Sequence, residues 1–171
     1  MNHKAVEIQA QTDFQKSLKQ SFWRKARHWL GRGCNDLLSF NEVFQYLKDR
    51  PRSDLGMRSV ALDQIVGSSG RYNDFDLAYY PRKKASNNRW VNVAKAKYLG
   101  VKLPPVLLYK IGDAYFVEDG NHRVSVARAN GEKYINARVI EVDVSNLRPE
   151  PSCTRLGYKL DNIEKCRQIS A

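Results

Sequence analysis

A short segment near residue 120 constrains the fold of this chain more than any other. Two runs rich in β-branched, aromatic and leucine residues, 106–109 and 114–117, flank a turn that contains Gly112, and this pattern predicts a β-hairpin. The hairpin leads directly into the loop 118–123, which reads Glu-Asp-Gly-Asn-His-Arg, and a predicted helix follows over 124–130. Because the loop contains a glycine, the backbone can turn sharply between strand and helix.

The loop 118–123 has the chemical features of a phosphate site. The first N–H groups of a helix have no partner within the helix, and the positive end of its dipole lies there, so anions bind at that end. Arg123 offers a planar set of donors to a phosphate, and His122 can donate, accept or titrate. We expect these two residues, together with Gly120 and Asn121, to bind the phosphates of a nucleotide.

The same residues also have structural interpretations. Arg123 could form a salt bridge with Asp119 or Glu118, and His122 could bond to backbone at the start of the helix. Either of the two carboxylates, Glu118 or Asp119, could take either of two roles. One could bind Mg²⁺ or act as a base, while the other could cap the helix through its backbone N–H groups.

Residues 119–123 resemble the signature loop of the ParB/sulfiredoxin superfamily, and the resemblance covers roughly residues 60–142. It implies an α+β (α/β) fold, a small mixed sheet flanked by helices, in which the loop opens a helix and holds nucleotide phosphates. Members include CTP-dependent DNA-partition proteins, sulfiredoxin, a free-serine kinase, NTPase subunits of defence systems and reported DNases. The resemblance therefore implies ATP or CTP with Mg²⁺ as ligands. It favours Asp119 as the metal ligand, because Asp119 matches the family loop better than Glu118 does.

The resemblance leaves the reaction open. We expect NTP hydrolysis coupled to DNA binding or DNA cleavage, which would make the protein an NTPase or a ParB-like nuclease with Asp119, His122 and Glu118 as its catalytic residues. One alternative is a non-catalytic DNA-binding regulator that uses the loop as a nucleotide sensor, and another is a small-molecule kinase. Sulfiredoxin chemistry is not expected, because Asn121 stands where sulfiredoxin has its nucleophilic cysteine.

A second loop, 67–71, is rich in glycine and serine and precedes the first by about fifty residues. Successive backbone N–H groups in such a loop can surround a phosphate. We therefore expect Ser68 and Arg71 to contact the nucleotide. A plain surface turn is the alternative, since the Gly-Lys-Ser/Thr of a P-loop does not follow.

Positive charge is concentrated in two segments of this chain of net charge +11. Residues 1–34 contain seven Lys/Arg against two Asp/Glu, residues 71–102 contain eight against two, and the remainder is balanced. Such an excess favours a nucleic-acid partner, with a solubility charge or an acidic protein partner as the alternatives. We expect DNA, single- or double-stranded and bound largely without sequence preference. The expected contacts are Arg82, Lys83, Lys84, Arg24, Lys25 and Arg27.

Hydrophobic spacing divides the chain into three parts. These are a basic helical N-terminal extension (1–57), the ParB/sulfiredoxin-like domain (58–145) and a tail with a short helix (146–171). The first helix is expected over 13–30, with Phe14, Leu18 and Phe22 on its apolar face. A capping box at 39–42 predicts a second helix. Within the domain, further elements are expected at 58–66 (a strand and turn), 89–99 (a helix) and 135–142 (a strand).

Composition narrows the class of protein. No run approaches the roughly 18 apolar residues of a membrane span, and the first residues lack the apolar core of a signal peptide. The three cysteines are far apart in the sequence and form no disulfide or zinc pattern. We therefore expect a cytoplasmic protein without a membrane partner, whose basic N-terminal helix binds DNA, another protein or a second copy of the chain in a homodimer.

Overall fold

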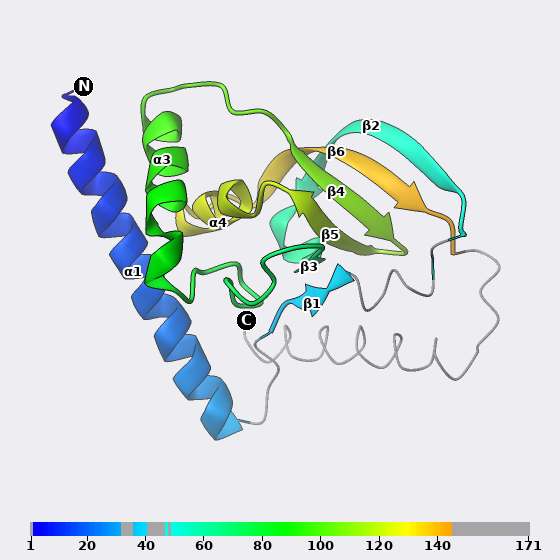
Figure 1. The fold of residues 1–171 in the computed structure, drawn as a ribbon, viewed down its shortest axis with the longest axis horizontal. Helices are drawn as coiled ribbons and strands as arrows, with labels where there is room; N and C mark the ends of the chain where they lie inside the picture. The colour runs from blue at the N-terminus through cyan, green and yellow to red at the C-terminus, as the bar shows by residue number, and fades with distance from the viewer. Residues whose placement is uncertain (1, 32–35, 41–46, 48, 145–171) are drawn as a thin grey trace.

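The structure of the protein is a computed structural model, which describes residues 2–31, 36–40, 47 and 49–144. These residues form helices packed beside a six-stranded mixed sheet (Figure 1), which confirms the expected α+β fold class. No helix in these ranges combines the length and the apolar composition that a membrane crossing requires. The tail beyond residue 144 and most of the capping-box helix, including residues 41–46, lie outside the described residues.

The sheet has the strand order β1-β3-β5-β4-β6-β2. Parallel pairs join β1 to β3, β3 to β5 and β4 to β6, while β5 with β4 and β6 with β2 are antiparallel. The elements are α1 (His3–Gly31), β1 (Leu38–Ser39), β2 (Arg52–Ala61), β3 (Ile65–Ser68), α3 (Asn87–Tyr98), β4 (Val106–Ile111), β5 (Ala114–Asp119), α4 (Asn121–Ala129) and β6 (Tyr134–Val142).

The helices are stacked in layers on the sheet. Helix α4 contributes Val124 and Ala127 to the core beneath it, α3 packs on α4, and α1 packs on α3 (Figure 1). The ring of Trp90 in α3 lies 5.5 Å from that of Phe14 in α1, and its Nε1 donates to Ser125 Oγ of α4 at 2.9 Å. Since all three residues are buried, these contacts fix α3 against α4.

Helix α1 differs from the expectation in its start and in part of its buried face. It begins at His3, ten residues before the expected start, so Asp13 lies within the helix and accepts a hydrogen bond from the Tyr98 hydroxyl at 2.8 Å. Phe14 is buried as expected, but Phe22 is 65% exposed, so its place on the apolar face was predicted wrongly. The buried stripe continues through small residues, Ser17 and Ser21, because the position of Phe14 on Trp90 sets the rotation of the helix.

The hairpin, helix and strand expected around the loop are all present. The hairpin is β4 with β5, the helix after it is α4, and the final strand is β6. The expected helix over 89–99 is α3, which begins two residues earlier. The first strand of the expected domain is longer than predicted, because β2 begins at Arg52 and crosses the expected boundary at residues 57 and 58.

A close packing contact at Gly67 explains why the second loop starts with glycine. A Cβ at this position would lie 2.5 Å from the Leu38 backbone oxygen of β1 and 2.6 Å from the Phe116 ring of β5. Any larger residue would push apart three neighbouring strands. Gly67 therefore allows β3 to pair in parallel with both neighbours at the point where the loop begins.

Candidate phosphate-binding site

The two loops expected to bind phosphate lie side by side in the structure. Strands β3 and β5 run parallel, with Ser68 opposite Val117, so both strands end at the same edge of the sheet. Two hydrogen bonds then join the loops that follow: Ser69 N donates to Val117 O at 2.9 Å, and Asn121 Nδ2 donates to Gly70 O at 3.3 Å. Residues fifty positions apart in the sequence thus meet at one place.

A hollow of about 510 Å³ lies between these two loops and the first half of α3. Such a volume is typical of sites for small molecules. It is lined by Gly70, Arg71, Arg89, Asn92, Val93, Glu118, Asp119, Gly120, Asn121, His122 and Arg123. The site residues expected from the loop 118–123 therefore line one hollow together with Arg71.

Ser68 is the expected nucleotide contact that does not line the hollow. Its side chain is fully buried, and its Oγ lies within hydrogen-bond distance of Gly70 O and of Val117 O, to either of which its one hydrogen can donate. The Gly70 N–H donates back to Oγ at 3.3 Å. Ser68 therefore holds the shape of the loop, and Gly70 and Arg71 form the part of the loop that faces the hollow.

The start of α4 presents its backbone to the hollow. Gly120 has φ +107°, and no side chain caps the helix through a hydrogen bond. Asn121 is 92% buried, and its Oδ1 has no hydrogen-bond partner among the described residues. A buried amide oxygen without a partner is costly, so its position at the wall of a hollow indicates a place for a ligand or a water.

His122 is neutral at physiological pH. Burial, and after it the positive charges of Arg71 and Arg89, lower the pKa of His122 to about 4, while the negative charge of Asp74 opposes this shift. Its ring packs edge-on against Phe75 at 5.3 Å, and neither ring nitrogen has a hydrogen-bond partner among the described residues. The alternative that His122 bonds to backbone is therefore not what the structure shows.

Arg123 forms the salt bridge that was the alternative to a phosphate role. Its Nη2 donates to Asp119 Oδ2 at 2.5 Å, and its Nη1 donates to the carbonyl oxygens of Pro104 and Pro105, the latter at 2.8 Å. The Arg123 side chain is only 13% exposed, whereas that of Asp119 is 74% exposed. Arg123 thus joins the segment before β4 to the start of α4, and it is one of the residues that line the hollow.

Sequence reasoning missed the contribution of α3. Arg89 lies in the first turn of α3, lines the hollow and forms no hydrogen bond or ion pair with another described residue. A signal for it exists in the sequence, because a positive charge in the first turn opposes the helix dipole and no acidic residue is present there. An unfavourable charge at that position indicates a role outside the helix.

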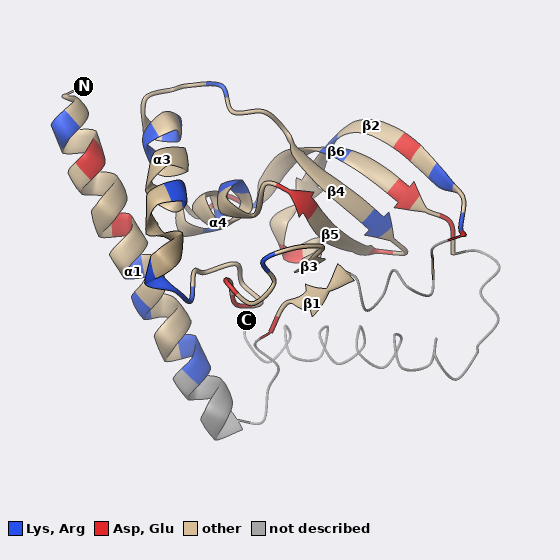
Figure 2. Cartoon of the chain, viewed as in Figure 1, with Lys and Arg blue, Asp and Glu red and all other residues tan. Residues whose placement is uncertain are grey.

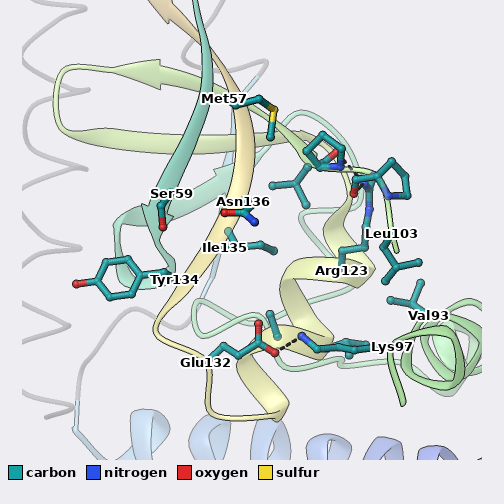
Figure 3. Close-up of a pocket in the computed structure, with 15 residues that line it drawn as sticks. Met57, Ser59, Val93, Lys97, Leu103, Arg123, Glu132, Tyr134, Ile135 and Asn136 are labelled. Atoms are coloured by element: carbon teal, nitrogen blue, oxygen red, sulfur yellow. Dashed lines mark hydrogen bonds and ion pairs between the residues drawn. The ribbon is translucent and has the colours of Figure 1, made fainter. Parts of the chain in front are cut away.

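A second hollow, of about 380 Å³, lies on the other side of Arg123 (Figure 3). Apolar side chains from α3, α4 and the segment 103–106 form one part of its wall, and residues of β2 and β6 form another. The ion pair of Lys97 with Glu132 lies at one margin. The two hollows share Val93 and Arg123. Arg123 therefore separates the two hollows, and its bonds to the two proline carbonyls lie on the side of the second hollow.

Three of the six residues expected to contact DNA are paired with acids of the same chain. Arg82 pairs with Asp36 at 2.7 Å, Lys83 with Asp74 at 3.0 Å, and Arg24 with the buried Asp76 at 3.4 Å. Lys84 and Lys25 are exposed and have no such partner among the described residues, and the side chain of Arg27 lies outside them. In Figure 2, Lys and Arg positions recur along α1 and α3, while most Asp and Glu positions lie on strands and connecting loops.

Comparisons with protein-family models, with curated proteins and with solved structures found no match. The geometry of the hollow and its charges are therefore the basis for a proposed function.

The low pKa of His122 has a consequence for stability. In the unfolded chain an ordinary histidine binds a proton near pH 6.5, whereas in the folded protein His122 does so only near pH 4. Between these values the unfolded chain holds more protons, so the free energy of unfolding should fall as the pH drops from 6.5 towards 4 and be unaffected by His122 above 6.5. We expect a loss of about 1–2 kcal/mol, discounted because the ring is only partly buried.

Denaturant unfolding of wild type and His122→Phe between pH 4.5 and 7.5 tests this expectation. The phenylalanine keeps a ring against Phe75 and removes the titration, so the difference between the two proteins isolates His122 from Asp76, whose pKa burial raises. The exposed His3→Ala variant should behave like wild type. Parallel pH profiles for wild type and His122→Phe would contradict the assignment.

Proposed function

We propose that the hollow binds the phosphate groups of a nucleotide, with ATP or CTP as the expected ligand. The observation that carries this proposal is the convergence of the uncapped start of α4 with Arg71 and Arg89, from two other parts of the chain, around one hollow. Backbone N–H groups and guanidinium groups are the donors that proteins use for phosphate. Asn121 lines the same hollow, and its buried Oδ1, which has no hydrogen-bond partner among the described residues, is consistent with a polar ligand there.

The acids of the hollow fit a Mg²⁺ ion that arrives with the phosphates. Glu118 and Asp119 both line the hollow and are exposed, and no cluster of three His, Cys, Asp or Glu is found in the described part of the chain. Two carboxylates suffice, since Mg²⁺ takes its remaining ligands from phosphate and water. When bound there, the ion would neutralise charge on the phosphate oxygens.

Hydrolysis in this hollow would be slow. A general base works best when its pKa lies near the working pH, and burial lowers the pKa of His122 to about 4. Both ring nitrogens of His122 are buried, so His122 would orient a water or a phosphate oxygen only after a local rearrangement. Arg71 and Arg89 line the hollow and can stabilise negative charge on the transferred group. The same geometry serves the alternative, a nucleotide sensor without turnover, and a phosphate-release assay on wild type and His122→Phe separates the two.

DNA remains the proposed partner of the nucleotide-bound protein. Lys84 precedes α3 by three residues, and Arg89 lies in its first turn, so exposed positive charge is present near the mouth of the hollow. The cations already paired with aspartates would release fewer counterions on binding DNA. A plot of log binding constant against log salt concentration becomes shallower by roughly 0.9 for each free cation that is removed from a DNA contact. Replacing Arg82 or Lys83 with alanine should reduce this slope by less, because each is already paired with an aspartate.

Calorimetric titration with ATP, CTP and GTP tests the proposed function, and Arg89 offers the most informative variant. Because Arg89 has no hydrogen bond or ion pair with other described residues, Arg89→Ala should leave stability unchanged. Loss of a charge-assisted hydrogen bond to phosphate costs about 1.5–3 kcal/mol, so nucleotide affinity should fall about 10- to 100-fold. Arg123→Ala should also weaken binding, but it removes bonds to two backbone carbonyls and should destabilise the fold.

Arg58→Ala is the matched control, because Arg58 is an exposed arginine on β2 outside both hollows. It should bind nucleotide like wild type. If wild type binds none of the nucleotides, with or without Mg²⁺, the proposal is overturned. It is also overturned if Arg89→Ala, Arg58→Ala and wild type all bind nucleotide with equal affinity.

A further inference from the structure

The two carboxylates of the hollow are in different situations. Asp119 lies within 2.5 Å of the Nη2 of Arg123, whereas Glu118 forms no ion pair with another described residue. Both line the same hollow and are neighbours in the chain. The Nη2 group of Arg123, a residue that lines the hollow, is thus already paired with an anion of the protein itself.

The contacts of Arg123 show which partner of the ion pair can move. The Nη1 of Arg123 donates to the carbonyl oxygens of two prolines that line the second hollow, and the Arg123 side chain is 13% exposed. Asp119 is 74% exposed, and nothing but Arg123 holds its side chain among the described residues. An arriving phosphate would therefore displace the carboxylate of Asp119 and leave the guanidinium in place.

A displaced Asp119 would still lie at the wall of the hollow, close to the phosphate. Two negative charges at such a separation repel each other, and the repulsion grows where water is excluded. A divalent cation between them removes the repulsion and gives the released carboxylate a partner. Binding of phosphate and of cation would then each strengthen the other by the same factor.

We propose that Asp119 is a specificity-determining residue that occupies the phosphate position on Arg123, so that the hollow selects polyphosphates complexed with Mg²⁺ over bare anions. The inference rests on the proposed function. The ligand class is a nucleoside di- or triphosphate with its metal ion. Bare anions such as inorganic phosphate would have to displace the carboxylate without compensation. Asn121 lines the same hollow and is 92% buried, and its Oδ1 has no hydrogen-bond partner within the described part of the chain, which is a second observation that points to a ligand there.

The test is calorimetric titration with inorganic triphosphate and with ATP, each in EDTA and in excess Mg²⁺. Asp119→Asn keeps the size of the side chain and removes its charge, while Glu118→Gln removes the same charge from the neighbouring residue without touching Arg123. In EDTA, Asp119→Asn should bind triphosphate about tenfold more tightly than Glu118→Gln does. Mg²⁺ should strengthen binding to wild type at least tenfold and to Asp119→Asn no more than about threefold. Asp119→Ser gives a second variant without the carboxylate, and thermal unfolding confirms that each variant is folded.

The outcomes distinguish the two proposals. If neither wild type nor any variant binds triphosphate or ATP under either condition, the proposed function fails and the inference fails with it. If wild type binds but the Asp119 variants match Glu118→Gln in EDTA, or bind more weakly than wild type there, the inference fails and the proposed function stands. If only the Asp119 variants bind triphosphate more tightly than wild type in EDTA, and Mg²⁺ strengthens their binding less, the result supports both the proposed function and the inference.

Discussion

Replacing Gly120 with alanine is expected to destabilise the protein by about 2–5 kcal/mol and to abolish ligand binding in the hollow. The new Cβ would lie 2.6 Å from Val106 Cγ1 and 3.0 Å from Arg123 Nε, and the backbone has φ +107°, which L residues rarely adopt. Strain of this kind costs about 1–3 kcal/mol, and overpacking a closed site costs a similar amount again. Relief of the contact would move Arg123 or the loop, and either shift disturbs the donors at the start of α4.

Denaturant unfolding and triphosphate titration measure both effects, and Gly131→Ala is the matched control. Gly131 also has a positive φ, +73°, but nothing lies within 4 Å of a Cβ built there. It should therefore show only the cost of backbone strain and should keep ligand binding. Equal losses of stability in the two variants would contradict the packing argument at Gly120.

Replacing Arg24 with alanine is expected to cost about 2–3 kcal/mol, a result that its assignment as a DNA contact does not predict. Asp76 is fully buried, and its Oδ1 accepts hydrogen bonds from the Tyr80 and Ala78 N–H groups, while Oδ2 lies 3.4 Å from Arg24 Nε. Burial raises the pKa of Asp76, and the positive charges of Arg24 and Arg82 oppose that rise. Removing one partner of a buried pair leaves an uncompensated charge, which costs several kcal/mol when burial is complete on both sides.

Two further variants separate this structural role from a role on DNA. Lys25→Ala changes the same charge at the next, exposed position and should leave the unfolding free energy within about 0.5 kcal/mol of wild type. Asp76→Asn in the Arg24→Ala background should recover part of the loss, because the amide needs no counter-charge. An Arg24→Ala variant as stable as wild type, with weakened DNA binding, would restore the original assignment.

The elements near residue 120 could be predicted because their signals are local. A hairpin turn at Gly112, a glycine at the strand end and a small apolar face on α4 all lie within about twenty-five residues. The parallel pairing of β3 with β5 is not local, yet the two phosphate-type loops could be recognised separately, and the sheet then brings them together. Membership of the chain in the ParB/sulfiredoxin superfamily stays a prediction from the sequence.

Several differences from expectation involve partners distant in the sequence. Asp13, the expected first residue of the helix, lies well inside α1 and accepts a hydrogen bond from Tyr98 of α3. Composition cannot show that Arg24, Arg82 and Lys83 would each find an aspartate, because those aspartates lie on other segments or become buried only in the fold. The role of α3 in the hollow was missed for the same reason.

The most direct test of the phosphate-site proposal is to follow backbone amide signals of ¹⁵N-labelled protein while inorganic triphosphate and then Mg²⁺–ATP are added. The amides of Gly70, Asn121 and His122 border the hollow, so they should shift strongly and saturate together, while those of Gly112 and Gly131, at turns away from it, should not move. Shifts confined to the basic surface of α1, or no saturable shift at the start of α4, would contradict a phosphate-binding site in this hollow.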